Sequence, residues 1–270
     1  MQQPHPPDQP IDIWADSTAY DAYIGRWSRL VARAFLPWLS IEPKQRWLDI
    51  GSGSGALVRA ILDQAQPHEI KGIDRSPEYV RFLRAAVRDP QVSFDVADAQ
   101  SLPFAASQFD VVVSGLVLNF IPEPRAALSE MVRVTQLGGT IAAYVWDYAG
   151  QMQMLRYFWD AVVALDPEMR ERDEARRFPI CQPDALQTLF ASVGLHAVAV
   201  QAIDIDTTFR DFDDYWTPFL GGQGPAPTYV AALPEEERAI LRERIRARLP
   251  FAVDGSIPLV ARAWAVRGRR

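Results

Sequence analysis

Short apolar runs alternate with amphipathic helical patterns along most of the chain. Continuous apolar runs predict strands at residues 46–51, 69–74, 92–97, 109–115, 139–146, 196–205 and 257–266. Apolar residues at three- and four-residue spacing predict helices near residues 55–65, 77–88, 124–134, 151–165, 183–193 and 235–248. Because the first strands are continuously apolar, they indicate a parallel sheet covered on both faces. The alternation predicts a doubly wound α/β fold.

Three segments fall outside this alternation. Residues 1–12 are rich in proline and glutamine, without a basic start or apolar core, and predict a disordered leader that is not a signal peptide. Residues 14–39 carry aromatic and aliphatic side chains at helical spacing, which indicates either a helix packed on the core or one whose aromatic face covers a pocket. Residues 206–256 are too long for a plain connection and predict a lid. We expect one domain, residues 13–270, that includes this lid insertion.

Composition narrows the class of protein. A chain of 270 residues with 49% hydrophobic and 23% charged residues fits a globular enzyme with one substantial core. No apolar run approaches the roughly 18 residues that cross a bilayer. The net charge of −6 argues against a nucleic-acid or anionic-membrane partner. The single cysteine, Cys181, excludes an internal disulfide framework and predicts a cytoplasmic location.

A glycine-rich turn follows the first predicted strand. Gly51, Gly53 and Gly55 allow positive φ, bring the backbone close to a ligand and expose N–H donors at the start of a helix. Such a turn holds a nucleotide-like cofactor at a helix N-terminus. The same residues also satisfy the dinucleotide-binding pattern, so the glycines do not separate NAD from other cofactors.

Acidic residues end three successive predicted strands and carry more information. Asp49 stands two residues before Gly51, where a carboxylate suits a ligand with ammonium and sulfonium charge better than a pyrophosphate. Asp74 is placed to accept ribose hydroxyls, and Asp98 to accept the exocyclic amine of an adenine. The alternative for each acid is that it caps the loop or turn that follows its strand.

Taken together, these motifs resemble the class I S-adenosylmethionine-dependent methyltransferases, in the small-molecule branch that includes the ubiquinone/menaquinone-biosynthesis type. The resemblance covers residues 18–147 and is carried by residues 48–55, 72–74, 98–104, 109–112 and 137–140. It implies a Rossmann-like sheet of seven strands with the last strand antiparallel, an N-terminal helix and a helical lid insertion. It also implies S-adenosyl-L-methionine as cofactor and S-adenosyl-L-homocysteine as product.

The resemblance assigns the cofactor to residues that match the family motifs. The glycine loop would line the methionine part near Asp49, Asp74 would bind the ribose, and Asp98 would contact the adenine. Tyr20, Tyr23 or Arg26 would reach the cofactor carboxylate. The implied cofactor-binding residues are Tyr20, Arg26, Asp49, Gly51, Ser52, Gly53, Gly55, Asp74, Arg75, Ser76, Asp98, Ala99, Gln100, Ser114, Gly115 and Leu116.

The acceptor is expected to be a small, partly apolar molecule, since aromatic side chains cluster near the strand ends and in the lid. The candidate acceptor residues are Tyr23, Trp27, Asn119, Phe120, Trp146, Trp216 and Phe219. Asp147 or Tyr148 could orient or deprotonate the acceptor; alternatively, Asp147 caps the helix near residue 151. No histidine is placed as an obvious base, so we expect in-line methyl displacement that relies on proximity.

Other functions remain as alternatives. A nucleic-acid or protein methyltransferase is disfavoured by the absence of an Asn/Asp-Pro-Pro-aromatic motif after the fourth strand, where residues 114–117 read Ser-Gly-Leu-Val. An NAD(P)-dependent oxidoreductase is disfavoured because no tyrosine precedes Lys44 or Lys71 by four residues. A cofactor-binding protein without activity is a third alternative. One cysteine and three scattered histidines predict no metal site. The sequence predicts neither the acceptor atom nor an oligomeric state.

Overall fold

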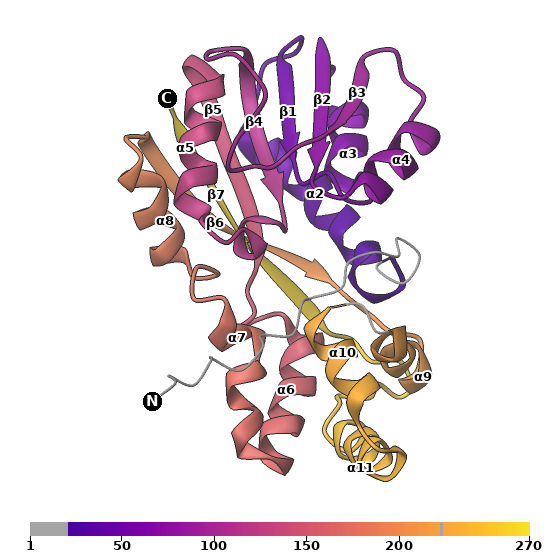
Figure 1. Cartoon of the computed structure of the whole chain (residues 1–270). Helices are drawn as coiled ribbons and strands as arrows, with labels where there is room; N and C mark the ends of the chain where they lie inside the picture. Colours follow the sequence, from indigo (N-terminus) through magenta and orange to yellow (C-terminus); the bar gives the residue numbers. More distant parts are fainter. Residues whose placement is uncertain (1–20, 222–223) are drawn as a thin grey trace, which may run out of the picture.

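The computed structural model describes residues 21–221 and 224–270 and contains one seven-stranded sheet with the order β3-β2-β1-β4-β5-β7-β6 (Figure 1). The strands are β1 (Arg46–Ile50), β2 (Glu69–Asp74), β3 (Val92–Val96), β4 (Phe109–Gly115), β5 (Thr135–Trp146), β6 (His196–Asp206) and β7 (Val260–Arg269). β1 to β5 pair in parallel, whereas β7 is antiparallel to both β5 and β6. The predicted seven-stranded sheet with an antiparallel last strand is therefore confirmed.

Helices cover both faces of the sheet. A π-helical turn, η1 (Asp21–Gly25), leads into α2 (Arg26–Leu39), which packs beside α3 (Ala56–Gln64). The next helix, α4 (Pro77–Ala86), lies on the same face of the sheet. The opposite face carries α5 (Pro124–Val134) and α8 (Pro183–Ser192). This division follows from right-handed crossovers that run in opposite directions from β1 and β4.

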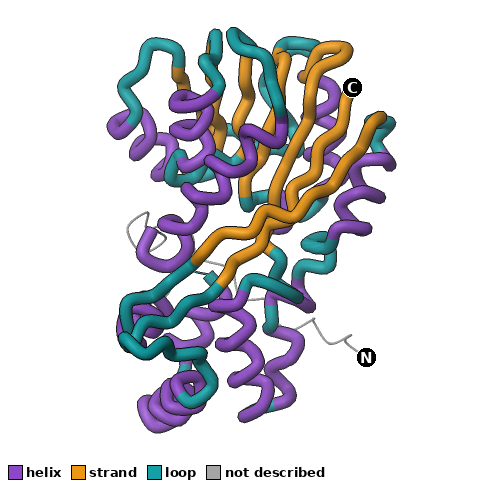
Figure 2. The backbone as a smooth tube through the Cα atoms, turned by 180° about the vertical axis from the view of Figure 1, so that it is seen from behind, coloured by secondary structure: helices purple, strands orange, loops and turns teal. Residues whose placement is uncertain are grey.

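A second group of helices lies beyond the carboxyl ends of the parallel strands. We call it the helical lobe; it consists of α6 (Gln153–Leu165), η3 (Pro167–Arg172), α9 (Phe212–Trp216), η4 (Thr217–Gly221), α10 (Pro225–Ala232) and α11 (Glu235–Arg246). The short α7 (Glu174–Arg177) leads from η3 back to the sheet. The long β6–β7 pair extends from the sheet toward this lobe (Figure 2).

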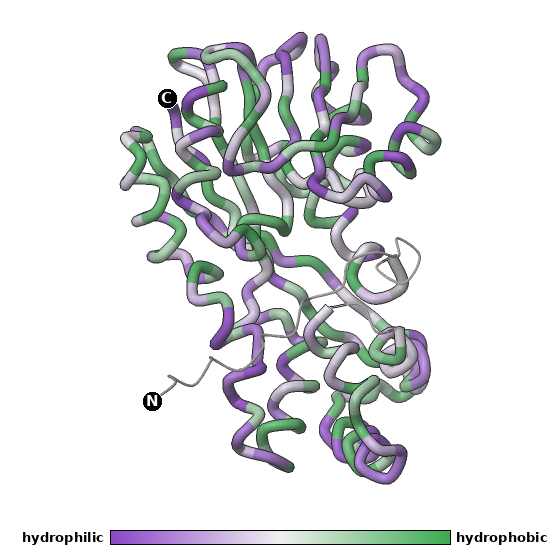
Figure 3. Tube along the Cα trace, in the orientation of Figure 1, coloured by the Kyte–Doolittle hydropathy of each residue, from purple (hydrophilic) through white to green (hydrophobic). Residues whose placement is uncertain are grey.

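The core runs along the central strands, where hydrophobic residues follow one another (Figure 3). Val111, Val112 and Val113 are at most 2% exposed, as a strand covered on both faces requires. Local signals start the helices: Ser76 accepts a hydrogen bond from the Tyr79 N–H at the start of α4, and Pro77 takes the first helical position.

The largest boundary difference concerns β5, which begins at Thr135 instead of residue 139. The register shifts where β4 pairs with it, between Phe109 and Val111, and Gly138 has a φ of 77°. The strand therefore continues through an irregularity that resembles a turn in the sequence. The last strand begins three residues later than predicted, at Val260.

Candidate functional site

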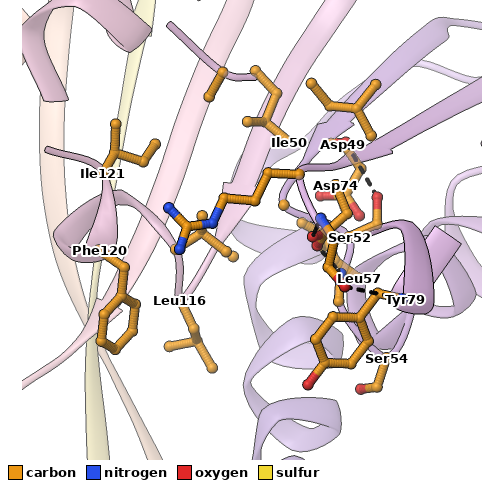
Figure 4. A pocket seen from close by; sticks show the side chains of 18 of the residues that line it. Asp49, Ile50, Ser52, Ser54, Leu57, Asp74, Tyr79, Leu116, Phe120 and Ile121 are labelled. Carbon is orange, nitrogen blue, oxygen red and sulfur yellow. Dashed lines mark hydrogen bonds between the residues drawn. The ribbon is translucent and has the colours of Figure 1, made fainter. Parts of the chain in front are cut away.

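A cavity of about 560 Å³ opens at the carboxyl ends of β1, β2, β4 and β5, where ligands bind in open α/β sheets. The predicted residues that line it are Asp49, Gly51, Ser52, Gly53, Asp74, Arg75, Ser76, Asp98, Ala99, Gln100, Gly115, Leu116, Phe120, Trp146 and Tyr148. Figure 4 shows two sides of this cavity. Asp49, Asp74 and Tyr79 lie on one side, whereas Leu116 and Phe120 lie on the other.

The glycine loop holds the cavity wall close to β4. Gly51 has a φ of 73°, and a Cβ atom there would lie 2.5 Å from Val117 Cγ2. The loop amides are used within the protein: Gly51 and Ser52 donate to the Ile73 carbonyl, and Gly53 donates to Asp74 Oδ2 at 2.9 Å. The Gly55 N–H donates to the Ser52 carbonyl at 2.8 Å. The expectation that Gly51, Gly53 and Gly55 expose their N–H groups is therefore wrong, because these groups form hydrogen bonds within the loop or to the end of β2.

Asp49 brings a buried carboxyl group to the cavity. The residue is 1% exposed, and neither carboxylate oxygen has a hydrogen-bond partner. Burial, together with the nearby charge of Asp74, raises the pKa of Asp49 to about 7. The neighbouring Ser52 hydroxyl, which donates to the Asp49 backbone carbonyl at 3.2 Å, partly opposes the shift. A buried and unpartnered carboxylate is costly, so this position favours a ligand that brings a positive charge or hydrogen-bond donors.

Asp74 combines a lining position with a structural contact. Its Oδ1 accepts from Ser76 N and its Oδ2 from Gly53 N, both at 2.9 Å. Burial raises the pKa of Asp74, and these backbone hydrogen bonds act in the opposite direction. The Asp74 carboxylate therefore holds the glycine loop through Gly53 and the turn after β2 through Ser76. The second contact is the one that the capping alternative predicts.

Asp98 is exposed at the cavity rim. Its Oδ1 accepts a hydrogen bond of 2.8 Å from Gln100 N, and a bridge joins it to Ser101. It thus caps a turn after β3 and also lines the cavity.

The far end of the cavity is largely aromatic and aliphatic. Tyr144 and Trp146 point to the same face of β5, and Tyr148 follows them into the cavity lining. Gly115 is required here, because a Cβ atom would lie 2.4 Å from the Tyr144 hydroxyl. Tyr144 was not predicted from the sequence, yet its two-residue spacing from Trp146 is a signal that could have identified it.

Further lining residues were also missed. Tyr79 comes from α4, while Ile24 and Ser28 come from the η1–α2 segment. Residues 14–39 were expected either to pack on the core or to cover a pocket with their aromatic face. In the described part, Ile24 and Ser28 line the cavity, whereas the aromatic side chains of Tyr23 and Trp27 are buried in the core.

Several predicted residues of the described chain do not line the cavity, and Tyr20 lies outside the described residues. Gly55 and Ser114 are not part of the lining, and Ser114 Oγ donates to the Ile50 carbonyl. Asn119 is absent from the lining, although its amide oxygen and nitrogen are buried without a hydrogen-bond partner.

Asp147 serves the turn before α6. Its carboxylate accepts hydrogen bonds from Gly150 N at 3.0 Å and from Gln151 N at 2.9 Å, and it does not line the cavity. This geometry corresponds to the capping alternative, although α6 itself begins only at Gln153.

Arg26 is engaged by the helical lobe. Its Nη1 lies 2.9 Å from Asp214 Oδ1, and its guanidinium lies over the rings of Trp27 and Phe209 at 4.4 and 4.8 Å. The guanidinium therefore joins α2 to α9 and does not line the cavity.

The predicted aromatic lid residues pack in the interior of the helical lobe. Phe219 stacks on Phe158 with 4.6 Å between ring centroids, and it also contacts Tyr23 and Trp216. Tyr23, Trp27, Trp216 and Phe219 are each at most 8% exposed, and none lines the cavity. Sequence patterns cannot separate such a core from a pocket wall, because both need large apolar side chains.

In the part of the chain that the structure describes, no helix is long and apolar enough to span a membrane. Within residues 21–221 and 224–270, no cluster of three or more His, Cys, Asp or Glu side chains could hold a metal ion.

Comparisons with known proteins place this site in context. Residues 48–143 match a family model described as a methyltransferase domain. The chain is 34% identical over 116 residues to a demethylmenaquinone methyltransferase of Renibacterium salmoninarum, which is 43% of this chain and 46% of that protein. It is 29% identical over 147 residues to the chloroplastic 2-methyl-6-phytyl-1,4-hydroquinone methyltransferase 2 of rice, which is 53% of this chain and 42% of that protein. The matched regions thus span less than half the length of these relatives.

A solved structure extends the similarity to most of the fold. The phosphoethanolamine N-methyltransferase 2 of Haemonchus contortus, in complex with S-adenosyl-L-methionine, superimposes with a TM-score of 0.60 at 16% identity. The match covers 94% of this chain and 57% of that one. At this identity the likeness concerns the fold alone.

Proposed function

We propose that this chain, which carries a class I S-adenosylmethionine-dependent methyltransferase domain, transfers the methyl group of S-adenosyl-L-methionine to a small, partly apolar acceptor. The observation that carries the proposal is the Asp49 carboxyl group, which is buried in the cavity wall without a hydrogen-bond partner. An aminoacyl ammonium group would supply both the charge and the donors that this carboxyl group lacks.

The other lining residues fit the remaining parts of that cofactor. Asp74 and Asp98 lie at neighbouring strand ends and would accept hydrogen bonds from ribose hydroxyls and from an adenine amine. Gly115 and Leu116 would pass under it. When bound, the cofactor supplies an electrophilic sulfonium methyl group.

The protein would contribute position and exclusion of water. Tyr144, Trp146 and Phe120 provide an apolar end in which a ring-containing acceptor could lie against the methyl group. Tyr148 is a candidate to orient the acceptor. Asp147 would contribute to the reaction only indirectly, because its carboxylate holds the turn that follows Trp146.

The relatives named above support a hydroquinone-like acceptor. Both are named for methyl transfer to quinone-related rings. The aromatic side chains at one end of the cavity would favour such a ring, because aromatic rings pack well against one another. The residues of the predicted lid insertion, 206–256, would then shield the reaction from above the strand ends. The absence of a nucleic-acid partner and a cytoplasmic location stay predictions.

Calorimetric titration with S-adenosyl-L-homocysteine and with NAD tests the cofactor. We expect S-adenosyl-L-homocysteine to bind and NAD to bind far more weakly. The negatively charged pyrophosphate of NAD would face the Asp49 carboxyl group, and no positive charge would compensate for it. Asp49→Asn serves as the matched variant and should weaken binding of S-adenosyl-L-methionine. Preferential binding of NAD would instead support the oxidoreductase alternative.

Turnover is tested with 1,4-naphthohydroquinone as the acceptor probe, with formation of S-adenosyl-L-homocysteine followed by mass spectrometry. Methylated probe is the expected result. Tight cofactor binding without methylation of any ring acceptor would support the non-catalytic alternative or a different acceptor class.

A further inference from the structure

We propose that Phe178 sets the length of the acceptor end of the cavity and thereby determines which acceptors fit; this inference rests on the proposed function. Phe178 follows α7 and is 9% exposed. Phe178 does not itself line the cavity, so any effect on a ligand acts through the residues that it contacts.

Two rings that line the cavity contact Phe178. Phe120 and Tyr148 line the cavity, and their ring centroids lie 5.0 and 5.6 Å from that of Phe178, which is not part of the lining. The Phe120 contact is edge-to-face, at 74° between the ring planes. Because Phe178 packs against both lining rings, we infer that it limits how far they move aside for a ligand.

A partly buried guanidinium holds this arrangement in place. Arg156 donates to the Tyr148 carbonyl at 3.1 Å and to Asp173 Oδ2 at 2.6 Å. Its side chain is 16% exposed and that of Asp173 is 13% exposed, so the contact is shielded from solvent. The Arg156 guanidinium thus joins the loop that contains Tyr148 to the segment that runs from Asp173 to Phe178.

Phe178 also contacts a charged group, because the Arg177 guanidinium lies over its ring at 5.1 Å. Cys181 is 1% exposed, and its N–H donates to the Phe178 carbonyl at 3.0 Å. Removal of the Phe178 ring would leave space beside the rings of Phe120 and Tyr148, and an apolar group could fill that space. The wild-type wall therefore favours a compact ring at this end, and the truncated wall would accept an apolar extension such as a prenyl group.

The test compares two acceptor probes, 1,4-naphthohydroquinone and the same ring with one prenyl substituent. For Phe178→Ala we expect the ratio of kcat/KM, prenylated over unsubstituted, to rise about tenfold or more, through a lower KM for the prenylated probe. Phe178→Leu should give an intermediate ratio. Phe190 is a fully buried residue of α8 that does not line the cavity, so Phe190→Leu is the control for a general loss of core packing. This variant should leave the ratio of kcat/KM values unchanged.

An unchanged ratio in Phe178→Ala, with S-adenosyl-L-homocysteine still bound, would overturn the proposal. An equal shift in Phe190→Leu would do the same, since it would assign the effect to packing in general. If wild-type protein binds S-adenosyl-L-homocysteine but methylates neither probe, the assignment of the acceptor end is wrong and Phe178 loses its role. If wild-type protein binds neither the cofactor nor its product, the proposed function itself fails.

Discussion

The carboxyl group of Asp49 lies at the end of β1, where its neighbours in the sheet leave no donor for it. The strand buries it because residues on both sides, Leu48 and Ile50, pack in the core. A single polar residue in an apolar run is therefore the sequence signal for a ligand that is itself charged.

We expect binding of S-adenosyl-L-methionine to depend on pH through this group. Burial raises the pKa of Asp49 to about 7, and only the ionised form attracts an ammonium group. Affinity should rise as pH increases toward 7, by up to about tenfold per pH unit, and then level off. Calorimetric titrations at several pH values up to about 7 measure how affinity changes with pH. Asp49→Asn should bind S-adenosyl-L-methionine weakly, and its affinity should not change with pH over this range. A flat profile in the wild-type protein would contradict the assignment.

Asp74→Ala should weaken binding of S-adenosyl-L-homocysteine by about 1–3 kcal/mol. The change removes acceptors for the ribose and also releases Gly53 N and Ser76 N, which the carboxylate now fastens. Calorimetric titration measures the loss. Asp95→Ala is a suitable control, because Asp95 pairs with Lys71 on β2 and does not line the cavity. Equal affinity in Asp74→Ala and wild type would exclude the proposed role.

At the scale of elements, the regular part of the chain could be predicted closely. β2 and β4 have their predicted bounds, and α5 does as well, because Pro124 starts the helix and a strand follows directly. Period and length were sufficient for these segments. Boundaries failed at Gly138, where a positive φ allows β5 to continue through residues that resemble a turn.

The helical lobe was only outlined by the sequence. The length of residues 206–256 predicted an insertion, but α9 and α10 are too short to show a helical period. The aromatic residues of this insertion were assigned to the acceptor, whereas Trp216 and Phe219 fill the interior of the lobe. Only tertiary packing decides between these outcomes, and local patterns do not contain it.

The contact between α2 and α9 gives a prediction for the lobe. Arg26→Ala removes the ion pair to Asp214 and the contacts over Trp27 and Phe209, and should cost about 1–2 kcal/mol of unfolding free energy. Hydrogen exchange should accelerate in α9, because its attachment to α2 is lost. Affinity for S-adenosyl-L-homocysteine should stay unchanged, since Arg26 does not line the cavity.

Asp214→Asn should reproduce the faster exchange in α9. Arg33→Ala, an exposed arginine of the same helix, is the control and should not. A large loss of cofactor affinity in Arg26→Ala would instead support the role that the family resemblance implied for this arginine.

At the scale of the whole molecule, the site joins residues from the start of the described chain, such as Ile24, with residues at the strand ends as far along the chain as Tyr148. Strand-end residues such as Gly51 and Asp74 could be located from sequence, because parallel strands bring their carboxyl ends to one edge. Tyr79 and Ile24 could not, since their approach depends on how α4 and η1 pack against that edge. Phe178 was missed for the same reason.

Two buried carboxyl groups make the stability of the ligand-free protein depend on pH. Burial raises the pKa of Glu174 to about 8, as it raises that of Asp49 to about 7, so the folded state keeps protons that the unfolded chain releases near pH 4. Between these values the folded state binds more protons. The free energy of unfolding should therefore fall as pH rises from about 5 toward 8, by up to about 1.4 kcal/mol per pH unit for each group.

Denaturant unfolding at several pH values measures this slope, and Glu174→Gln should reduce it because the amide keeps the shape of the side chain but has no proton to lose. Carboxylates with a lowered pKa, such as Asp110 and Asp204, act in the opposite direction only at more acidic pH, where they become protonated. They are ionised in both states above about pH 5 and do not mask the effect. A free energy of unfolding that stays constant or rises from pH 5 to 8 would mean that neither buried carboxyl group keeps its proton in the folded protein.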